Sequence, residues 1–142
     1  MGKPRIAVVG AGKVGSALAL LLSRQGYPVA GIASRSLLSA RRVADELSVP
    51  ATVRPGEVTA GADVVFITTP DRVISRVARE IADGGGFLPG QVVFHTSGAH
   101  SAEEVGAARS CGALAASLHP LQSFADVGMA MENLPGSYFA LE

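Results

Sequence analysis

The glycine-rich segment at residues 10–15 constrains the fold of this chain more than any other feature. It reads Gly-Ala-Gly-Lys-Val-Gly, so its three glycines have GxGxxG spacing. Residues 5–10 contain the apolar run Ile-Ala-Val-Val, which predicts a strand buried on both faces. The leucines that follow the glycines have helical spacing up to Gly26, which predicts a helix that ends there. A strand, a glycine turn and a helix in this order are typical of a dinucleotide-binding site.

Each glycine of this segment has a separate expected role. Gly10 permits a tight turn, Gly12 lets a pyrophosphate approach the backbone, and Gly15 lets the helix pack on the strand. Phosphates bind free N–H groups at the positive end of such a helix. The candidate cofactor-binding residues here are Gly10, Ala11, Gly12, Lys13, Val14 and Gly15. Two alternatives stay open, a glycine turn without a ligand and the similar loop with which methyltransferases bind S-adenosylmethionine.

Strand and helix patterns alternate along the rest of the chain. Further strands are expected at 28–34, 50–53, 63–68, 91–95, 114–118 and 137–141. Helices are expected after Ser36 and Asp71, each as an N-cap, and after Ser101, which forms a capping box with Glu104. The Gly-rich loop at 54–62 is expected to carry little structure, and one helical turn is expected near 127–131. The alternation predicts an α/β fold, a doubly wound, mostly parallel sheet of the Rossmann NAD(P)-binding type.

Composition excludes several classes of protein. The 142 residues suit one domain, and 48% hydrophobic residues exclude intrinsic disorder. Twelve basic and 12 acidic residues give no net charge, so nucleic acid is not an expected partner. No stretch reaches about 18 apolar residues without a charge, so a membrane is not expected either. The single Cys111 cannot form an internal disulfide, which favours a cytoplasmic setting and a small buried thiol.

The end of the second strand predicts which cofactor is bound. Enzymes that use NAD usually carry Asp or Glu about 20 residues after the glycines, where it binds the adenosine ribose. This chain has Ser34-Arg35-Ser36 and no acid there. A guanidinium between two hydroxyls suits a 2′-phosphate, so we expect NADP(H). The alternative is that Arg35 is an ordinary solvated charge.

The fourth strand ends in Thr68-Thr69-Pro70. In a doubly wound sheet this carboxyl end faces the ligand crevice, and Pro70 forces an extended exit from the strand. Thr69 is therefore a candidate hydrogen-bond partner of a cofactor ribose, with a simple capped turn as the alternative.

All three histidines lie near two further strand ends, in His95-Thr-Ser-Gly-Ala-His100 and Ser-Leu-His119-Pro120. The grouping favours a substrate pocket, because histidine exchanges protons near neutral pH. Structural, hydrogen-bonded imidazoles are the alternative. A metal site is disfavoured, since the nearby Glu103 and Glu104 serve a helix start.

These motifs together carry a resemblance to a known family. GAGKVG, SRS, TTPD, HTSGAHSAEEV and SLHPLQSF resemble the two-domain NADP-dependent oxidoreductases that have a Rossmann-like N-terminal domain and a helical C-terminal domain of unknown function. That family is similar to the pyrroline-5-carboxylate reductase, prephenate dehydrogenase and 6-phosphogluconate dehydrogenase group. The resemblance implies a catalytic His119 and a substrate-orienting Ser97. It also implies a homodimer formed through a helical second domain that this chain lacks.

The sequence therefore predicts that residues 1–142 are one dinucleotide-binding domain, the N-terminal part of a longer protein. Its expected function is NADP(H) binding in an oxidoreductase that transfers hydride to or from a small carbonyl, alcohol or imine. The chain alone is expected to be inactive. The alternative is a sensor that binds NADP(H) and performs no chemistry, for which the histidine segments would be unnecessary.

Overall fold

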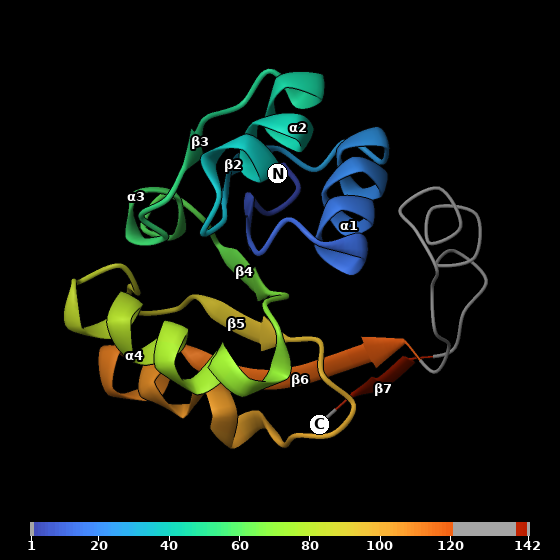
Figure 1. Ribbon diagram of the computed structural model, residues 1–142. Coiled ribbons are helices and arrows are strands. Elements are labelled where there is room, and N and C mark those ends of the chain that lie inside the picture. Colours follow the sequence, from blue (N-terminus) through green and yellow to red (C-terminus); the bar gives the residue numbers. More distant parts are fainter. Residues whose placement is uncertain (1, 121–138, 142) are drawn as a thin grey trace.

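A seven-stranded sheet forms the centre of the protein in the computed structural model, which describes residues 2–120 and 139–141 (Figure 1). Its strands are β1 (Ile6–Val9), β2 (Val29–Ala33), β3 (Ala51–Thr52), β4 (Val64–Ile67), β5 (Val92–His95), β6 (Leu114–Pro120) and β7 (Phe139–Leu141). The spatial order is β3-β2-β1-β4-β5-β6-β7, and all neighbours are parallel except β6 and β7. The predicted doubly wound, mostly parallel sheet is confirmed.

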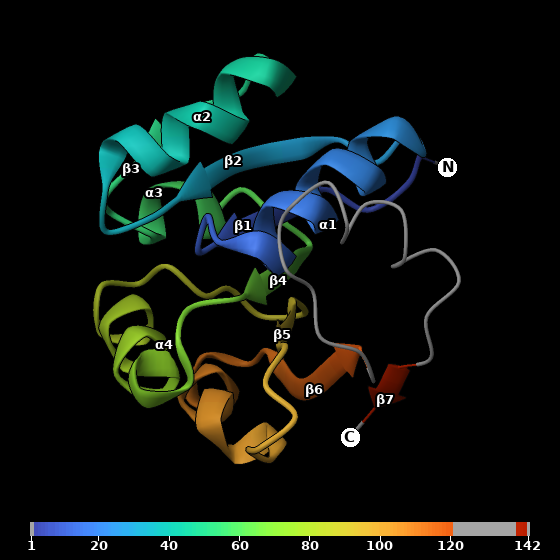
Figure 2. The same ribbon diagram turned by 45° about the vertical axis from the view of Figure 1, so that its right-hand side comes forward.

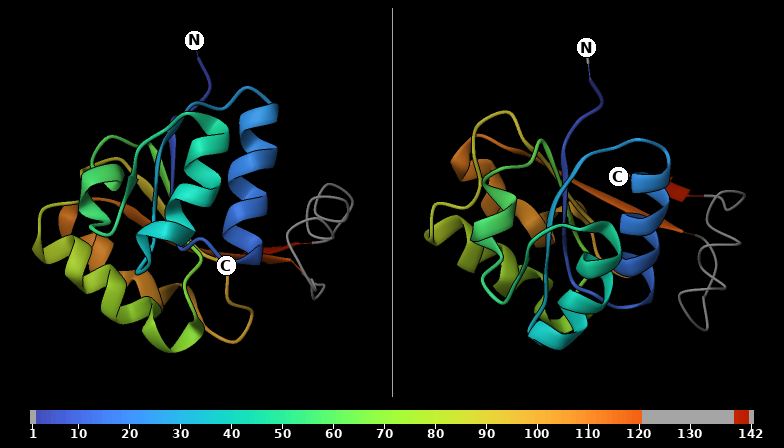
Figure 3. Two further views of the ribbon diagram at one scale, coloured as in Figure 1. Left: turned by 45° about the horizontal axis from the view of Figure 1, so that its top comes forward. Right: turned by 90° about the horizontal axis from the view of Figure 1, so that it is seen from above.

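Helices cover both faces of the sheet (Figures 1 and 3). The α-helices are α1 (Lys13–Arg24), α2 (Leu37–Leu47), α3 (Gly56–Thr59) and α4 (Ile74–Asp83), and the 3₁₀ helices are η1 (Asp71–Val73) and η2 (Ala102–Cys111). Helices α1 and α2 pack on one face, and α3, α4 and η2 pack on the other. None of the helices in the described residues is long and apolar enough to cross a membrane.

The core consists of two apolar layers because successive strand residues point to opposite faces. In β1, Ala7 and Val9 belong to the layer under α4, whereas Ile6 and Val8 belong to the layer under α1 and α2. All four side chains are buried, as expected for a strand between two helical layers. The lone Cys111 is only partly buried and packs against the first layer.

The structure confirms one predicted helix end and one predicted helix start. Gly26 has a φ of +90° and follows the end of α1, a backbone conformation that favours glycine. Ser36 caps α2, since its side chain accepts a hydrogen bond from the Ser39 N–H.

Two predictions between β3 and α4 were wrong. The loop at 54–62 contains the short helix α3, whose Val58 is buried against the sheet. Asp71 does not cap α4 with its side chain, because a 3₁₀ turn intervenes and α4 begins only at Ile74. Pro70 occupies the cap position of that turn in an extended conformation, as expected for the strand exit.

The segment after β5 also differs from prediction. Ser101 caps η2, but its hydroxyl accepts from the Glu103 N–H, and the expected capping box with Glu104 does not form. The Glu104 N–H instead donates to the Ser101 carbonyl, which is the i→i+3 bond of a 3₁₀ helix.

The sixth strand is two residues longer than predicted. Strand β6 runs through His119 and Pro120, which pair with Ala140 and Phe139 of β7. His119 therefore belongs to the strand and does not follow it. The helical turn expected at 127–131 lies outside the described residues.

Candidate functional site

A cleft of about 820 Å³ lies at the carboxyl ends of the central strands. Strand β1 pairs with β2 on one side and β4 on the other, so the chain's direction of winding reverses there. Ligands of open α/β sheets bind at such a switch point. The cleft brings together residues that sequence analysis selected from distant segments: Gly10, Ala11, Gly12, Lys13, Val14, Ser34, Arg35, Thr68, Thr69, Pro70 and Ser97.

Two of the selected cofactor residues do not line the cleft. Gly15 is buried where α1 crosses β1, and a Cβ there would overlap the Gly10 carbonyl oxygen and Thr68 Oγ1. Ser36 is used as the cap of α2.

The glycine turn is closed by contact with the end of β4. Gly10 has a φ of +116°, and an added Cβ would lie 2.8 Å from the Thr68 carbonyl carbon. The close approach of the two segments therefore requires a residue without a side chain, as predicted for Gly10.

Gly12, in contrast, faces open space. A Cβ on Gly12 would meet no atom within 4 Å, and its backbone is extended with a φ of −82°. Helix α1 begins at the next residue with no side-chain cap and no acidic residue in its first turn. Within the described part of the chain, the N–H groups of residues 12–15 find no acceptor. The open side of Gly12 and these free donors fit an anionic ligand.

The two threonines at the end of β4 use their hydroxyl groups differently. Thr68 Oγ1 donates to the Gly10 carbonyl oxygen at 2.9 Å and lies 3.3 Å from that of Val9, so it is occupied in the glycine turn. Thr69 Oγ1 is buried and has no hydrogen-bond partner among the described residues. A buried hydroxyl without a partner is costly, so the geometry favours a ligand atom bonded to Thr69.

Arg35 lies at the entrance of the cleft beyond β2. Its side chain is exposed, and it forms no ion pair with the described residues. The hydroxyl-bearing Ser34 and Ser39 line the cleft beside it. Ser39 is one residue that sequence reasoning missed, although its place three residues after the Ser36 cap puts it at the same helix start.

The 3₁₀ turn η1, helix α4 and the segment after β3 supply most of the lining that sequence analysis did not select. Ser39 apart, the unselected lining residues are Val9, Val53, Pro55, Asp71, Arg72, Val73, Arg76, Val77, Glu80 and Thr96. Val53 is 51% exposed, so it adds apolar surface to the lining. Arg76 and Glu80 have i,i+4 spacing and share one face of α4, and Arg72 lies four residues earlier in η1. The sequence carried this spacing as a signal.

The histidine segments do not form one pocket in the described residues. His95 is fully buried and does not line the cleft, whereas Thr96 and Ser97 do. His100 lies 3.6 Å from the Glu104 carboxylate, away from the cleft lining. Neither of these two imidazoles lines the cleft, because His95 is enclosed and His100 lies beside Glu104. The substrate-pocket hypothesis stays a prediction for Ser97 and His119.

Comparison with protein families identifies the fold family. A family model described as a Rossmann-like domain matches residues 2–120, which is most of the chain. The chain belongs to the Rossmann-like domain family. A comparison with curated proteins found no match.

Solved structures similar to this Rossmann-like domain are oxidoreductases. A protein from Bacteroides fragilis assigned as an NADP oxidoreductase has a TM-score of 0.80 and 22% identity, covering 99% of this chain and 51% of its own. The 3-hydroxyisobutyrate dehydrogenase of Mycobacterium tuberculosis has a TM-score of 0.74 and 23% identity, covering 99% and 46%. The prephenate dehydrogenase of A. aeolicus, solved with hydroxyphenyl propionate and NAD⁺, has a TM-score of 0.72 and 17% identity, covering 99% and 51%.

These structures confirm the predicted group at the level of fold, and the last of them is a prephenate dehydrogenase, as the sequence motifs suggested. The chain spans about half the length of the solved structures that it matches.

Proposed function

We propose that this Rossmann-like domain binds NADP(H) in an oxidoreductase that transfers hydride to or from a small carbonyl, alcohol or imine. One observation carries the proposal. Among the described residues, the cleft joins the uncapped helix start of the GxGxxG turn to Arg35, an arginine that forms no ion pair there. The sequence places no carboxylate at the end of β2. The bound nicotinamide would supply the hydride donor or acceptor.

The residues of the cleft fit such a cofactor in three places. The free N–H groups of residues 12–15 suit the pyrophosphate, and the open side of Gly12 leaves room for it. Thr69 Oγ1, which lacks a partner in the described structure, suits a ribose hydroxyl. Arg35, with Ser34 and Ser39 beside it, suits the 2′-phosphate.

The charges of the lining also favour an anion. Lys13, Arg35, Arg72 and Arg76 line the cleft against only Asp71 and Glu80. Glu80 already forms an exposed ion pair with Arg76 at 3.8 Å. The remaining excess of positive charge lines the cleft in which the pyrophosphate and the 2′-phosphate of NADP(H), all negatively charged, would bind.

We assign the proton-transfer role to His119 and the orienting role to Ser97, as the family resemblance implies. Ser97 lines the cleft at the end of β5, and its hydroxyl accepts a hydrogen bond from the Ala99 N–H at 3.2 Å. This bond leaves the hydroxyl proton free for a substrate oxygen or nitrogen. His119 lies on the neighbouring strand β6.

Calorimetric titration with NADPH and NADH tests the choice of cofactor. Charge-assisted bonds to the 2′-phosphate are worth about 1.5–3 kcal/mol, so NADPH should bind at least about tenfold more tightly than NADH. Arg35→Ala should bring the two affinities together by weakening NADPH alone.

Arg41→Ala is the matched control, because Arg41 is an exposed arginine of the same helix region and does not line the cleft. It should leave the affinity ratio unchanged. Equal affinities in the unaltered protein, or a ratio that survives Arg35→Ala, would contradict the assignment.

A further inference from the structure

His95 is a buried imidazole that the proposed function does not use. It ends β5, pairs along the sheet with Ile67 and Ser117, and is 0% exposed. It shares a sheet face with Val93, so its ring lies on the side that α4 and η2 cover. An imidazole enclosed there needs hydrogen-bond partners for both ring nitrogens.

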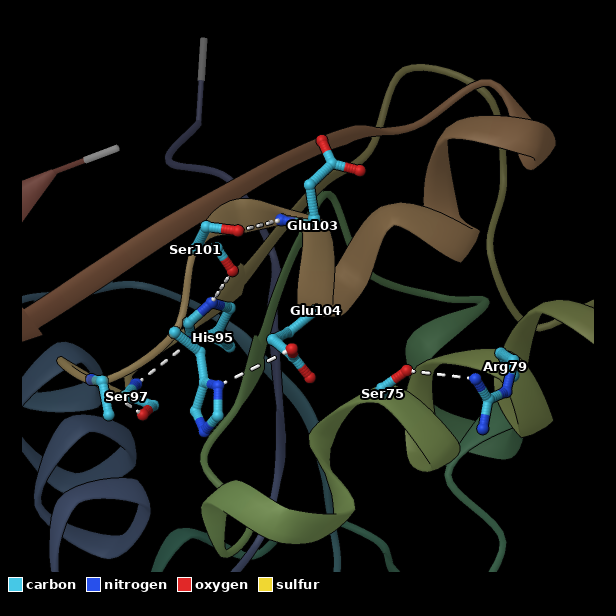
Figure 4. Close-up of polar contacts among 9 residues, drawn as sticks. Ser75, Arg79, His95, Ser97, Ser101, Glu103 and Glu104 are labelled. Carbon is cyan, nitrogen blue, oxygen red and sulfur yellow. Dashed lines mark hydrogen bonds and ion pairs between the residues drawn. The ribbon is translucent and has the colours of Figure 1, made fainter.

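Both partners come from the loop that immediately follows (Figure 4). Nε2 lies 2.6 Å from the Ser101 carbonyl oxygen, and Nδ1 lies 3.1 Å from the Ser97 backbone nitrogen. A carbonyl only accepts and an amide N–H only donates, so Nε2 carries the proton and Nδ1 offers its lone pair. The geometry thus selects one neutral tautomer of His95.

The two bonds hold both ends of the loop at 96–101. At one end are Thr96 and Ser97, which line the cleft. At the other end Ser101 starts η2, and its carbonyl oxygen also accepts from the Glu104 N–H. Ser97 is itself 7% exposed, and its hydroxyl accepts from Ala99 inside the same loop. The imidazole therefore links the position of Ser97 to the fixed start of a helix.

We propose that His95 is a positioning residue that sets the place of Thr96 and Ser97, the part of the cleft lining where the nicotinamide would meet the substrate. The inference rests on the proposed function, because it gives this loop a role toward the bound cofactor and substrate. His95 would act only through these two residues and would touch neither ligand. This role explains why a buried histidine directly precedes Thr96 and Ser97, two hydroxyl-bearing residues of the lining.

Three variants of the whole chain test the inference. His95→Phe keeps a ring and removes both bonds. His95→Asn places an amide oxygen near the Nδ1 position and keeps an acceptor for the Ser97 N–H, whereas His95→Gln places an amide nitrogen near Nε2 and keeps a donor to Ser101. His100→Gln is the control, because His100 belongs to the same loop but is paired with Glu104 outside the cleft.

The readout is the affinity for NADPH compared with that for 2′-phospho-ADP-ribose, which lacks the nicotinamide. We expect His95→Phe and His95→Gln to weaken NADPH about three- to tenfold, as for loss of one hydrogen bond, with 2′-phospho-ADP-ribose unchanged. His95→Asn and His100→Gln should stay within about twofold of the unaltered protein for both ligands.

Hydrogen exchange and nitrogen chemical shifts measure the contact itself, even if a variant fails to fold. In the unaltered protein the His95 ring should show a protonated Nε2 and an unprotonated Nδ1, and the Ser97 amide should be protected. The opposite tautomer, an unprotected Ser97 amide, or equal weakening of both ligands in His95→Phe would overturn the inference. If the unaltered protein binds neither ligand, the proposed function fails and the role of His95 toward it fails as well.

Discussion

Thr68 and Thr69 are identical neighbours that the fold assigns to different tasks. The Thr68 hydroxyl donates to the carbonyl of Gly10, a residue 58 positions earlier in the chain. The Thr69 hydroxyl is buried at the cleft with no partner in the described structure. The first therefore contributes to the stability of the glycine turn, and the second is available to a ligand.

Replacement of each threonine by valine separates these tasks. Thr68→Val removes a hydrogen bond to a buried turn and should lower the free energy of unfolding by about 1 kcal/mol. Thr69→Val removes a buried hydroxyl that has no partner, so stability should be unchanged or higher while NADPH binds more weakly. Denaturant unfolding and calorimetry on both variants check this. A loss of stability in Thr69→Val without a change in affinity would contradict it.

At the scale of elements, the glycine turn joins β1, α1 and the end of β4 into one unit. Gly10 and Gly15 allow the three segments to touch, because a side chain on either would collide with the backbone or with Thr68. Gly12 is free of such contacts and faces the cleft. The three glycines thus divide between packing and ligand approach.

Alanine substitution should reveal this division. Gly15→Ala forces α1 away from β1, so we expect a loss of about 1–3 kcal/mol in unfolding free energy, typical of overpacking. Gly12→Ala should cost less than about 1 kcal/mol, the difference between glycine and alanine at an N-cap, yet abolish measurable NADPH binding. Thermal melts with and without NADPH distinguish the variants. Unimpaired NADPH binding by Gly12→Ala would remove this turn from the site.

At the scale of the whole molecule, the sheet offers one wall for a cofactor. Figure 2 shows α2 in its upper part and α4 in its lower part, with β1 and β4 between them. The cleft lies at the carboxyl ends of these central strands. Hydride transfer also requires that substrate be held and water excluded. The solved oxidoreductases of similar fold are about twice as long as this chain.

We therefore expect binding without turnover. NADPH at a hundredfold its Kd should add about 2.7 kcal/mol to the free energy of unfolding, which raises the Tm by roughly 10 °C for a domain of this size. No steady oxidation of NADPH should follow on adding small carbonyls or imines. Absence of the Tm shift, or sustained turnover by this chain, would be the contrary result.

The sequence by itself determined the alternating architecture and the core of the site. Periodic apolar residues and single glycines act over a few positions, so β1, the glycine turn, α1 and the cap at Ser36 were predictable from local rules. The position of Arg35 at the end of β2 follows from the same local reading.

Only the tertiary structure decided which side chains have partners within the protein and which ones line the cleft. The pairing of Thr68 with Gly10, the enclosure of His95, and the cleft walls from Val53 and Arg76 all depend on contacts between distant segments. Strand β6 extends through Pro120 because β7 pairs with it from beyond residue 138. Burial and hydrogen bonds of this kind form between distant chain segments, and no local pattern encodes which segments will enclose a side chain or meet its hydroxyl group.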